Sequence, residues 1–163
     1  MNADERGFYS YPLIGVHSRP LTVGVLKMSV ELKHADITEQ IIKAFYAVYN
    51  TLGYGFLEKV YVKALIIEMQ KLGLEVAHNV EILVRYSGEV VGEYYADLVV
   101  ARLVIIEVKA AQAIAAEHEA QLLNYLKATP YEVGLVLNFG PKPQFKRKAF
   151  DNANKGTLSW TKP

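Results

Sequence analysis

The sequence of 163 residues contains no cysteine. This absence excludes disulfide bonds, thiolate catalysis and cysteine-based zinc sites, and it suits a reducing, cytoplasmic environment. No apolar run approaches the ~20 residues of a membrane span, and the first residues lack a signal-peptide pattern. The formal net charge is only +1, so charge neither indicates nor excludes a nucleic-acid partner. We therefore expect a soluble intracellular protein with no membrane segment.

The composition indicates one packed domain, because 52% of the residues are hydrophobic and 21% are charged. Prolines and glycines interrupt residues 1–33, where no periodicity survives. This part is predicted to be a poorly ordered N-terminal leader, and Met28 offers an alternative start. The domain itself is predicted to span residues 34–152, followed by a C-terminal tail over residues 153–163.

Hydrophobic periodicity predicts both helices and strands. Apolar residues at helical spacing favour a first helix, and alternating apolar residues favour a strand from Val76 to Tyr86. The order predicts an α/β fold, with a mixed four- to five-stranded sheet flanked by helices. Helices are expected over about 36–52, 56–72 and 115–128, and strands over 76–86, 90–100, 103–110 and 133–139, with a short edge strand within 142–150.

Three charged residues interrupt the apolar strands at the centre of the chain: Asp97, Glu107 and Lys109. Residues two apart on a strand share a face, so Glu107 and Lys109 point the same way. If the intervening turn has three residues, Asp97 lies opposite Glu107 with Cβ atoms ~5 Å apart. Such a pair is tolerated if one acid holds a proton or if a divalent cation lies between them. A simple buried salt bridge to Lys109 is the third interpretation.

Other polar residues are placed where they could flank this pair. Glu58 follows a glycine turn at the start of the second helix, and Gln121 and Tyr125 lie four apart on one face of the third. His118 precedes Gln121 and is expected to be a helix-start residue. A basic cluster near the C-terminus could bind a nucleic-acid backbone or could be a solvated tail; it comprises Lys142, Lys146, Arg147 and Lys148.

Taken together, these residues resemble the GxxExxY family of the PD-(D/E)XK nuclease superfamily. The resemblance covers about residues 36–150. A proline expected before Asp97 is absent, because Ala96 stands there. The name motif corresponds to Gly55, Glu58 and Tyr61, the acidic core to Asp97, Glu107 and Lys109, a QxxxY helix motif to Gln121 and Tyr125, and the fourth-strand ending to residues 134–140.

The resemblance implies a restriction-endonuclease-like core and a nuclease dependent on Mg²⁺ or Mn²⁺. It implies that Lys109 activates water and stabilises the transition state, and that Gln121 positions the nucleophile. The implied metal ligands are Asp97, Glu107, the backbone carbonyl of Val108, and Glu58, which also counts among the catalytic residues. The implied substrate contacts are Tyr125 and Tyr61, to which the basic cluster adds Arg147.

Two functions therefore compete on the sequence. The first is metal-dependent hydrolysis of phosphodiester bonds in nucleic acid, with DNA as the expected substrate. The second is a non-catalytic module that keeps the fold and binds nucleic acid or a protein. A homodimer, formed by helices near Glu58, is a further hypothesis.

Overall fold

The computed structural model describes residues 32–156. The predicted leader lies outside this range except for Leu32 and Lys33, as do residues 157–163 of the predicted tail. The elements are α1 (Ala35–Leu52), α2 (Glu58–Lys71), β1 (Val76–Tyr86), β2 (Glu89–Val100), β3 (Val104–Lys109), α3 (Ala116–Lys127), β4 (Val133–Phe139), β5 (Pro143–Ala149) and the short 3₁₀ helix η1 (Asn152–Asn154).

One mixed sheet of five strands carries the fold, in the order β1-β2-β3-β4-β5. Strands β3 and β4 are parallel and are joined through α3, and the other neighbours are antiparallel. The predicted α/β class and mixed sheet are confirmed, including the edge strand β5. No helix among residues 32–156 has the length and apolar character needed to span a membrane.

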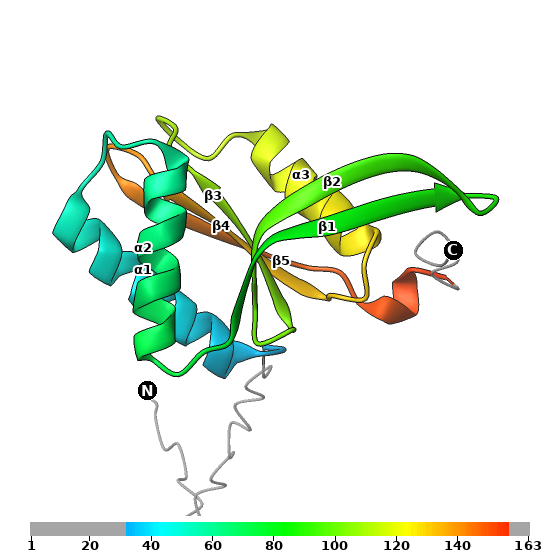
Figure 1. Ribbon diagram of the computed structural model, residues 1–163, viewed down its shortest axis with the longest axis horizontal. Coiled ribbons are helices and arrows are strands. Elements are labelled where there is room, and N and C mark those ends of the chain that lie inside the picture. The colour runs from blue at the N-terminus through cyan, green and yellow to red at the C-terminus, as the bar shows by residue number, and fades with distance from the viewer. Residues whose placement is uncertain (1–31, 157–163) are drawn as a thin grey trace, which may run out of the picture. The chain divides into compact units, whose positions relative to one another are not determined.

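Helices cover the two faces of the sheet, α1 and α2 on one and α3 on the other (Figure 1). Alternation along β3 divides the core accordingly: Ile106 packs toward α1 and α2, and Ile105 packs toward α3. Because both faces are covered, β3 and β4 are almost continuously apolar. A polar side chain on β3 is therefore held in a largely dry environment.

The sheet divides near the C-terminal end of β2. Strand β2 pairs with β3 only from Leu98 to Val100, and its longer N-terminal part continues with β1 as a projecting hairpin (Figure 1). The backbone of Asn79 on β1 is left-handed, with φ 53°, between the pairs His78–Leu98 and Val80–Ala96. Asparagine tolerates this conformation better than most residues. The irregularity coincides with the point where β2 leaves β3.

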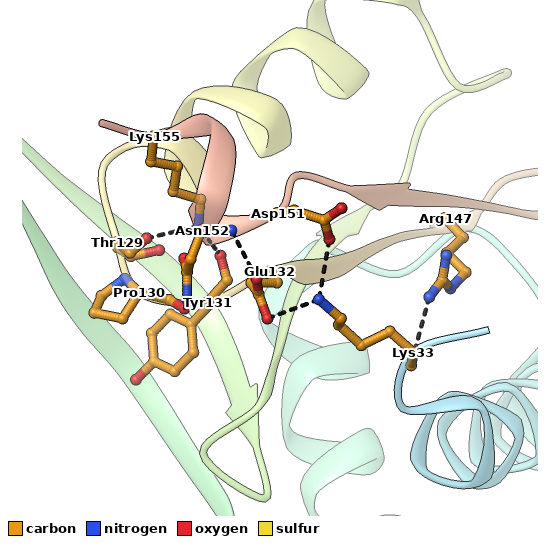
Figure 2. A network of polar contacts seen from close by, with 9 residues as sticks. All are labelled: Lys33, Thr129, Pro130, Tyr131, Glu132, Arg147, Asp151, Asn152 and Lys155. Atoms are coloured by element: carbon orange, nitrogen blue, oxygen red, sulfur yellow. Dashed lines mark hydrogen bonds and ion pairs between the residues drawn. The ribbon is translucent and has the colours of Figure 1, made fainter. Parts of the chain in front are cut away.

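A polar network ties both ends of the described chain to the loop before β4 (Figure 2). The Lys33 ammonium pairs with Glu132 and Asp151 at 3.0 Å each. Lys155 is only 3% exposed, and its Nζ donates to the carbonyls of Thr129 and Tyr131. Residues 153–156 of the predicted tail are thus anchored to the domain, while the boundaries of the leader and tail stay predictions.

The ends of β3 and β4 are fastened to each other through Asn138. Its side chain is fully buried, accepts a bond from the Ala111 N–H and donates one to the Ala111 carbonyl, both at 2.9 Å. Gly140, two residues after Asn138, also lies against Ala111: a Cβ at this glycine would approach the Ala111 oxygen to 2.1 Å. The segment after β3 is therefore held against the end of β4 with no room for a larger side chain.

Substitution of Asn138 tests this fastening. We expect Asn138→Ala to lower the free energy of unfolding by about 2 kcal/mol, because two buried main-chain groups lose their partners. Asn50→Ala, at an exposed position of α1, is the matched control and should change stability by less than about 0.5 kcal/mol. Chemical denaturation of both variants measures the difference, and equal stabilities would contradict the role given to Asn138.

Candidate active site

Asp97 and Glu107 lie at the point where β2 and β3 separate. The last paired residues are Leu98 and Ile106, so Asp97 and Glu107 occupy the next position of the register. The turn between the strands, residues 101–103, has the three residues that the sequence argument required. The two acids are therefore neighbours across the opening of the sheet, as the sequence predicts.

Main-chain amides hold both carboxylates in place. The Val108 N–H donates to Asp97 Oδ2 at 2.7 Å, and the Asp97 N–H lies 3.4 Å from Glu107 Oε1. Asp97 thus replaces the backbone acceptor that β2 would provide if it still followed β3. The N–H and C=O of one strand residue point to the same edge, so the Val108 carbonyl faces the same opening.

The acid pair is electrostatically unfavourable. Burial, with the adjacent Asp97 charge, raises the pKa of Glu107 to about 8, although Lys109 opposes the shift. Burial also raises the pKa of Asp97, against the Val108 hydrogen bond and Lys109, and the Glu58 charge adds to the rise. Because the folded pKa of Glu107 lies above its unfolded value, this acid opposes folding increasingly as the pH rises from about 5 to 8.

Lys109 is positioned by α3 as well as by β3. Its Nζ lies 3.6 Å from Glu107 Oε2, which confirms that the two side chains share a face. The same Nζ donates to Gln121 Oε1 at 3.0 Å, and Gln121 Nε2 donates to the Tyr125 hydroxyl at 2.8 Å. These bonds form a chain from α3 to the ammonium, so Gln121 orients Lys109 directly.

Both tyrosines for which substrate contacts are implied lie largely in the interior and make defined hydrogen bonds. Tyr125 is 4% exposed and its hydroxyl accepts from Gln121, so it supports the chain leading to Lys109. Tyr61 is 0% exposed; its hydroxyl donates to the Gly53 carbonyl at 3.0 Å and accepts from the Phe56 N–H at 3.2 Å. Tyr61 thereby fixes the turn between α1 and α2, and Tyr125 lines a hollow together with Tyr94 and Asn124. The substrate contacts of both tyrosines stay predictions.

Glu58 reaches the site from the first turn of α2, where the helix dipole favours a negative charge. The turn before it contains Gly55 at φ 108°, a conformation that favours glycine. Glu58 and Asp97 line one hollow of about 250 Å³, together with Lys59, Lys63, His78 and Asn79. The three motif residues therefore act locally: Gly55 and Tyr61 shape the turn, and Glu58 faces the hollow.

Arg147 is held away from the acid pair. It lies on β5, which β4 separates from β3, and its Nη2 donates to the Lys33 carbonyl at 2.8 Å (Figure 2). This guanidinium contacts the chain before α1, and its contact with substrate stays a prediction. Lys148 of the same basic cluster pairs with Glu119 of α3 at 2.8 Å.

Sequence reasoning missed His78 and Asn79, which line the hollow beside Asp97. A polar pair within a strand of alternating apolar residues was the available signal, but its position opposite Asp97 depends on the register of β1. His118 accepts from the Ala115 N–H at 3.1 Å, which fits the helix-start role expected for it.

The donor set suits a small hard cation. Among residues 32–156, no three His, Asp or Glu side chains converge closely enough to form a metal-binding group. Mg²⁺ is commonly held through one or two carboxylates with water completing the coordination. Asp97 and Glu107 supply two carboxylates to one opening, so they fit this mode.

The loss of stability caused by the acid pair can be measured in the absence of metal. In EDTA at pH 7, the free energy of unfolding of Glu107→Gln should be roughly 1 to 3 kcal/mol higher than that of the parent, because glutamine keeps the shape of the side chain and removes the buried charge. Glu75→Gln, at an exposed pair with Arg102, is the control and should have little effect. A parent more stable than Glu107→Gln would instead favour the simple salt bridge with Lys109.

Comparison with known proteins identifies the family. A family model described as the PD-(D/E)XK nuclease superfamily matches residues 35–148. None of the curated proteins matches the chain. The crystal structure of SSO0001 is 21% identical, with a TM-score of 0.45; the likeness covers 76% of this chain, which spans 63% of the length of SSO0001. Because the family model covers well over half of the 163 residues, the chain belongs to the PD-(D/E)XK nuclease superfamily.

Proposed function

We propose that the protein is a nuclease that uses Mg²⁺ or Mn²⁺ to hydrolyse phosphodiester bonds in nucleic acid, with DNA as its substrate. The observation that supports this function most directly is the pairing of the half-buried Asp97 with the buried Glu107, next to a Lys109 held in place by α3. Within the superfamily, Gly55, Glu58 and Tyr61 support membership of the GxxExxY family.

The proposed metal ligands are Asp97, Glu107 and the Val108 carbonyl, with Glu58 acting directly or through water. A bound divalent cation would polarise the phosphate and lower the pKa of a bound water. The part of the protein is to hold these oxygen donors in a fixed arrangement. The Val108 and Asp97 amides do so by restricting both carboxylates.

Lys109 is the proposed electrostatic catalyst. Cleavage of a phosphodiester places additional negative charge on the phosphoryl oxygens, and a fixed ammonium beside them stabilises that charge. Gln121 holds Lys109 from α3, and Tyr125 in turn restrains Gln121. We therefore assign Gln121 and Tyr125 as positioning residues, and Gln121 could also orient the attacking water.

The alternative is a module that binds nucleic acid or a protein without cleaving it. It is favoured by the absence of a three-residue metal-binding group in the part of the chain that the structure describes. The proposed nuclease needs the divalent metal for its activity, whereas a binding module needs no metal. The homodimer and the cytoplasmic location stay predictions.

Hydrolysis assays separate these functions. With Mg²⁺ or Mn²⁺, the parent should cleave DNA, and Asp97→Asn and Lys109→Met should each lower the rate by at least about 100-fold. Single-stranded and duplex DNA and RNA should all be offered, since the nucleic-acid form is part of the question. Lys43→Met, at an exposed position of α1, should leave the rate unchanged.

Calorimetric titration provides the accompanying binding measurement. Mg²⁺ or Mn²⁺ should bind the parent and should bind Asp97→Asn much more weakly. The folded parent could bind nucleic acid equally well in EDTA and in the metal, and cleave none of the four substrates, which are single-stranded DNA, duplex DNA, single-stranded RNA and duplex RNA. This result would reject the nuclease function and support the binding module.

A further inference from the structure

A second hollow adjoins the acidic site on the other side of Glu58. It has a volume of about 620 Å³ and lies between the α1–α2 turn and the segments that follow β3 and β4. Glu58 and Lys59 line both hollows. We call the larger one the aromatic cleft; its lining includes Tyr54, Phe56, Leu57, Ala111, Phe139 and Pro141.

The walls of the aromatic cleft are fixed by hydrogen bonds. Tyr61 holds the α1–α2 turn through Gly53 and Phe56. The Tyr49 hydroxyl lies 2.9 Å from both the Gly140 and the Pro141 carbonyl, which share its one hydrogen. Asn138 holds Ala111 on the remaining side, as described above. The cleft is therefore formed before any ligand arrives, which lowers the entropic cost of binding.

One wall of this cleft is unusually apolar for a surface. Tyr54 is 61% exposed and Phe56 is 48% exposed, and Leu57 beside them is more exposed still. Three adjacent large apolar side chains left in water indicate an interaction site. Phe56 also lies edge-on to the buried Tyr61 ring, with centroids 6.2 Å apart, and Tyr61 stacks on Phe139 at 4.1 Å. The exposed ring is thus backed by the core.

The smaller hollow carries charged side chains of both signs. Lys59, Lys63, His78 and Asn79 line it beside the Glu58 and Asp97 carboxylates, so it offers cations and polar groups near the proposed metal ligands. Phosphate groups are bound by such side chains, and bases are bound by aromatic ones. The two hollows meet at Glu58, so a polyanionic backbone in one hollow can present an attached base to the other.

We propose that the aromatic cleft binds an unpaired base of the substrate next to the phosphate that is cut, with Phe56 as its stacking surface. The inference rests on the nuclease function proposed above. A stacked duplex covers both faces of its bases, whereas a single strand can turn a base out onto a side chain. The preferred substrate is accordingly single-stranded nucleic acid or a single-stranded end.

Binding of matched oligonucleotides tests this specificity. Labelled oligothymidylate and a blunt DNA duplex of equal length are titrated with Lys109→Met protein in Mg²⁺, where cleavage is suppressed, and fluorescence anisotropy is measured. Adding Phe56→Ala should weaken single-strand binding about 5- to 150-fold, the range for loss of one stacked base, and should leave duplex binding within twofold. Phe56→Trp should retain the binding.

Two controls keep the outcome interpretable. Tyr86→Ala removes another exposed aromatic side chain, at the end of β1 on the projecting hairpin, and should leave both affinities unchanged. Phe56→Leu keeps the apolar packing against Tyr61 and removes the flat ring, so it should behave as Phe56→Ala does and replaces that variant if it fails to fold. Thermal melting by circular dichroism verifies folding.

Each remaining outcome has a separate meaning. If Phe56 variants weaken single-strand and duplex binding equally, or weaken neither, the stacking role of the aromatic cleft is rejected while nucleic-acid binding stands. If the Lys109→Met protein and the parent bind neither oligonucleotide, the proposed nucleic-acid function itself is rejected. If Phe56→Ala dissociates a dimer in sedimentation, a second copy of the chain occupies the cleft and the proposal is wrong.

Discussion

The divergence of β2 from β3 at Leu98 and Ile106 is the feature on which the candidate site depends. A regular sheet would fill this position with ladder hydrogen bonds and packed side chains. Here the strands separate, and the Val108 N–H is satisfied by the Asp97 carboxylate instead. Two acids, an ammonium and the Val108 carbonyl can therefore meet at an opening while the main chain remains bonded.

This arrangement opposes stability locally and is supported from outside. Glu107 and Asp97 are like charges in a mostly buried position, and burial raises the pKa of both. The rest of β3 and all of β4 are buried among apolar residues on both faces, and this packing outweighs the local cost. Costly charges held in place by a packed framework are typical of functional sites rather than of structural ones.

Much of this geometry could be predicted from short-range rules. Strand alternation placed Glu107 and Lys109 on one face, and a three-residue turn placed Asp97 opposite Glu107. The remainder depended on the folded path of the chain. The Tyr61 hydroxyl bonds to Gly53 and Phe56 across the α1–α2 turn, and Arg147 contacts Lys33, 114 residues earlier. Residue type alone could not distinguish a tyrosine or arginine that binds substrate from one that closes a loop.

The α1–α2 turn shows why a short motif can serve two purposes at once. Gly55 and Tyr61 fix its backbone, which places Glu58 at the start of α2 and leaves Phe56 exposed beside it. A glutamate and an aromatic ring two residues apart thus face the acidic hollow and the aromatic cleft from one rigid segment. If the turn were loose, the two hollows could still exist, but their spacing would vary, and the proposed base and phosphate positions would lose their constant separation.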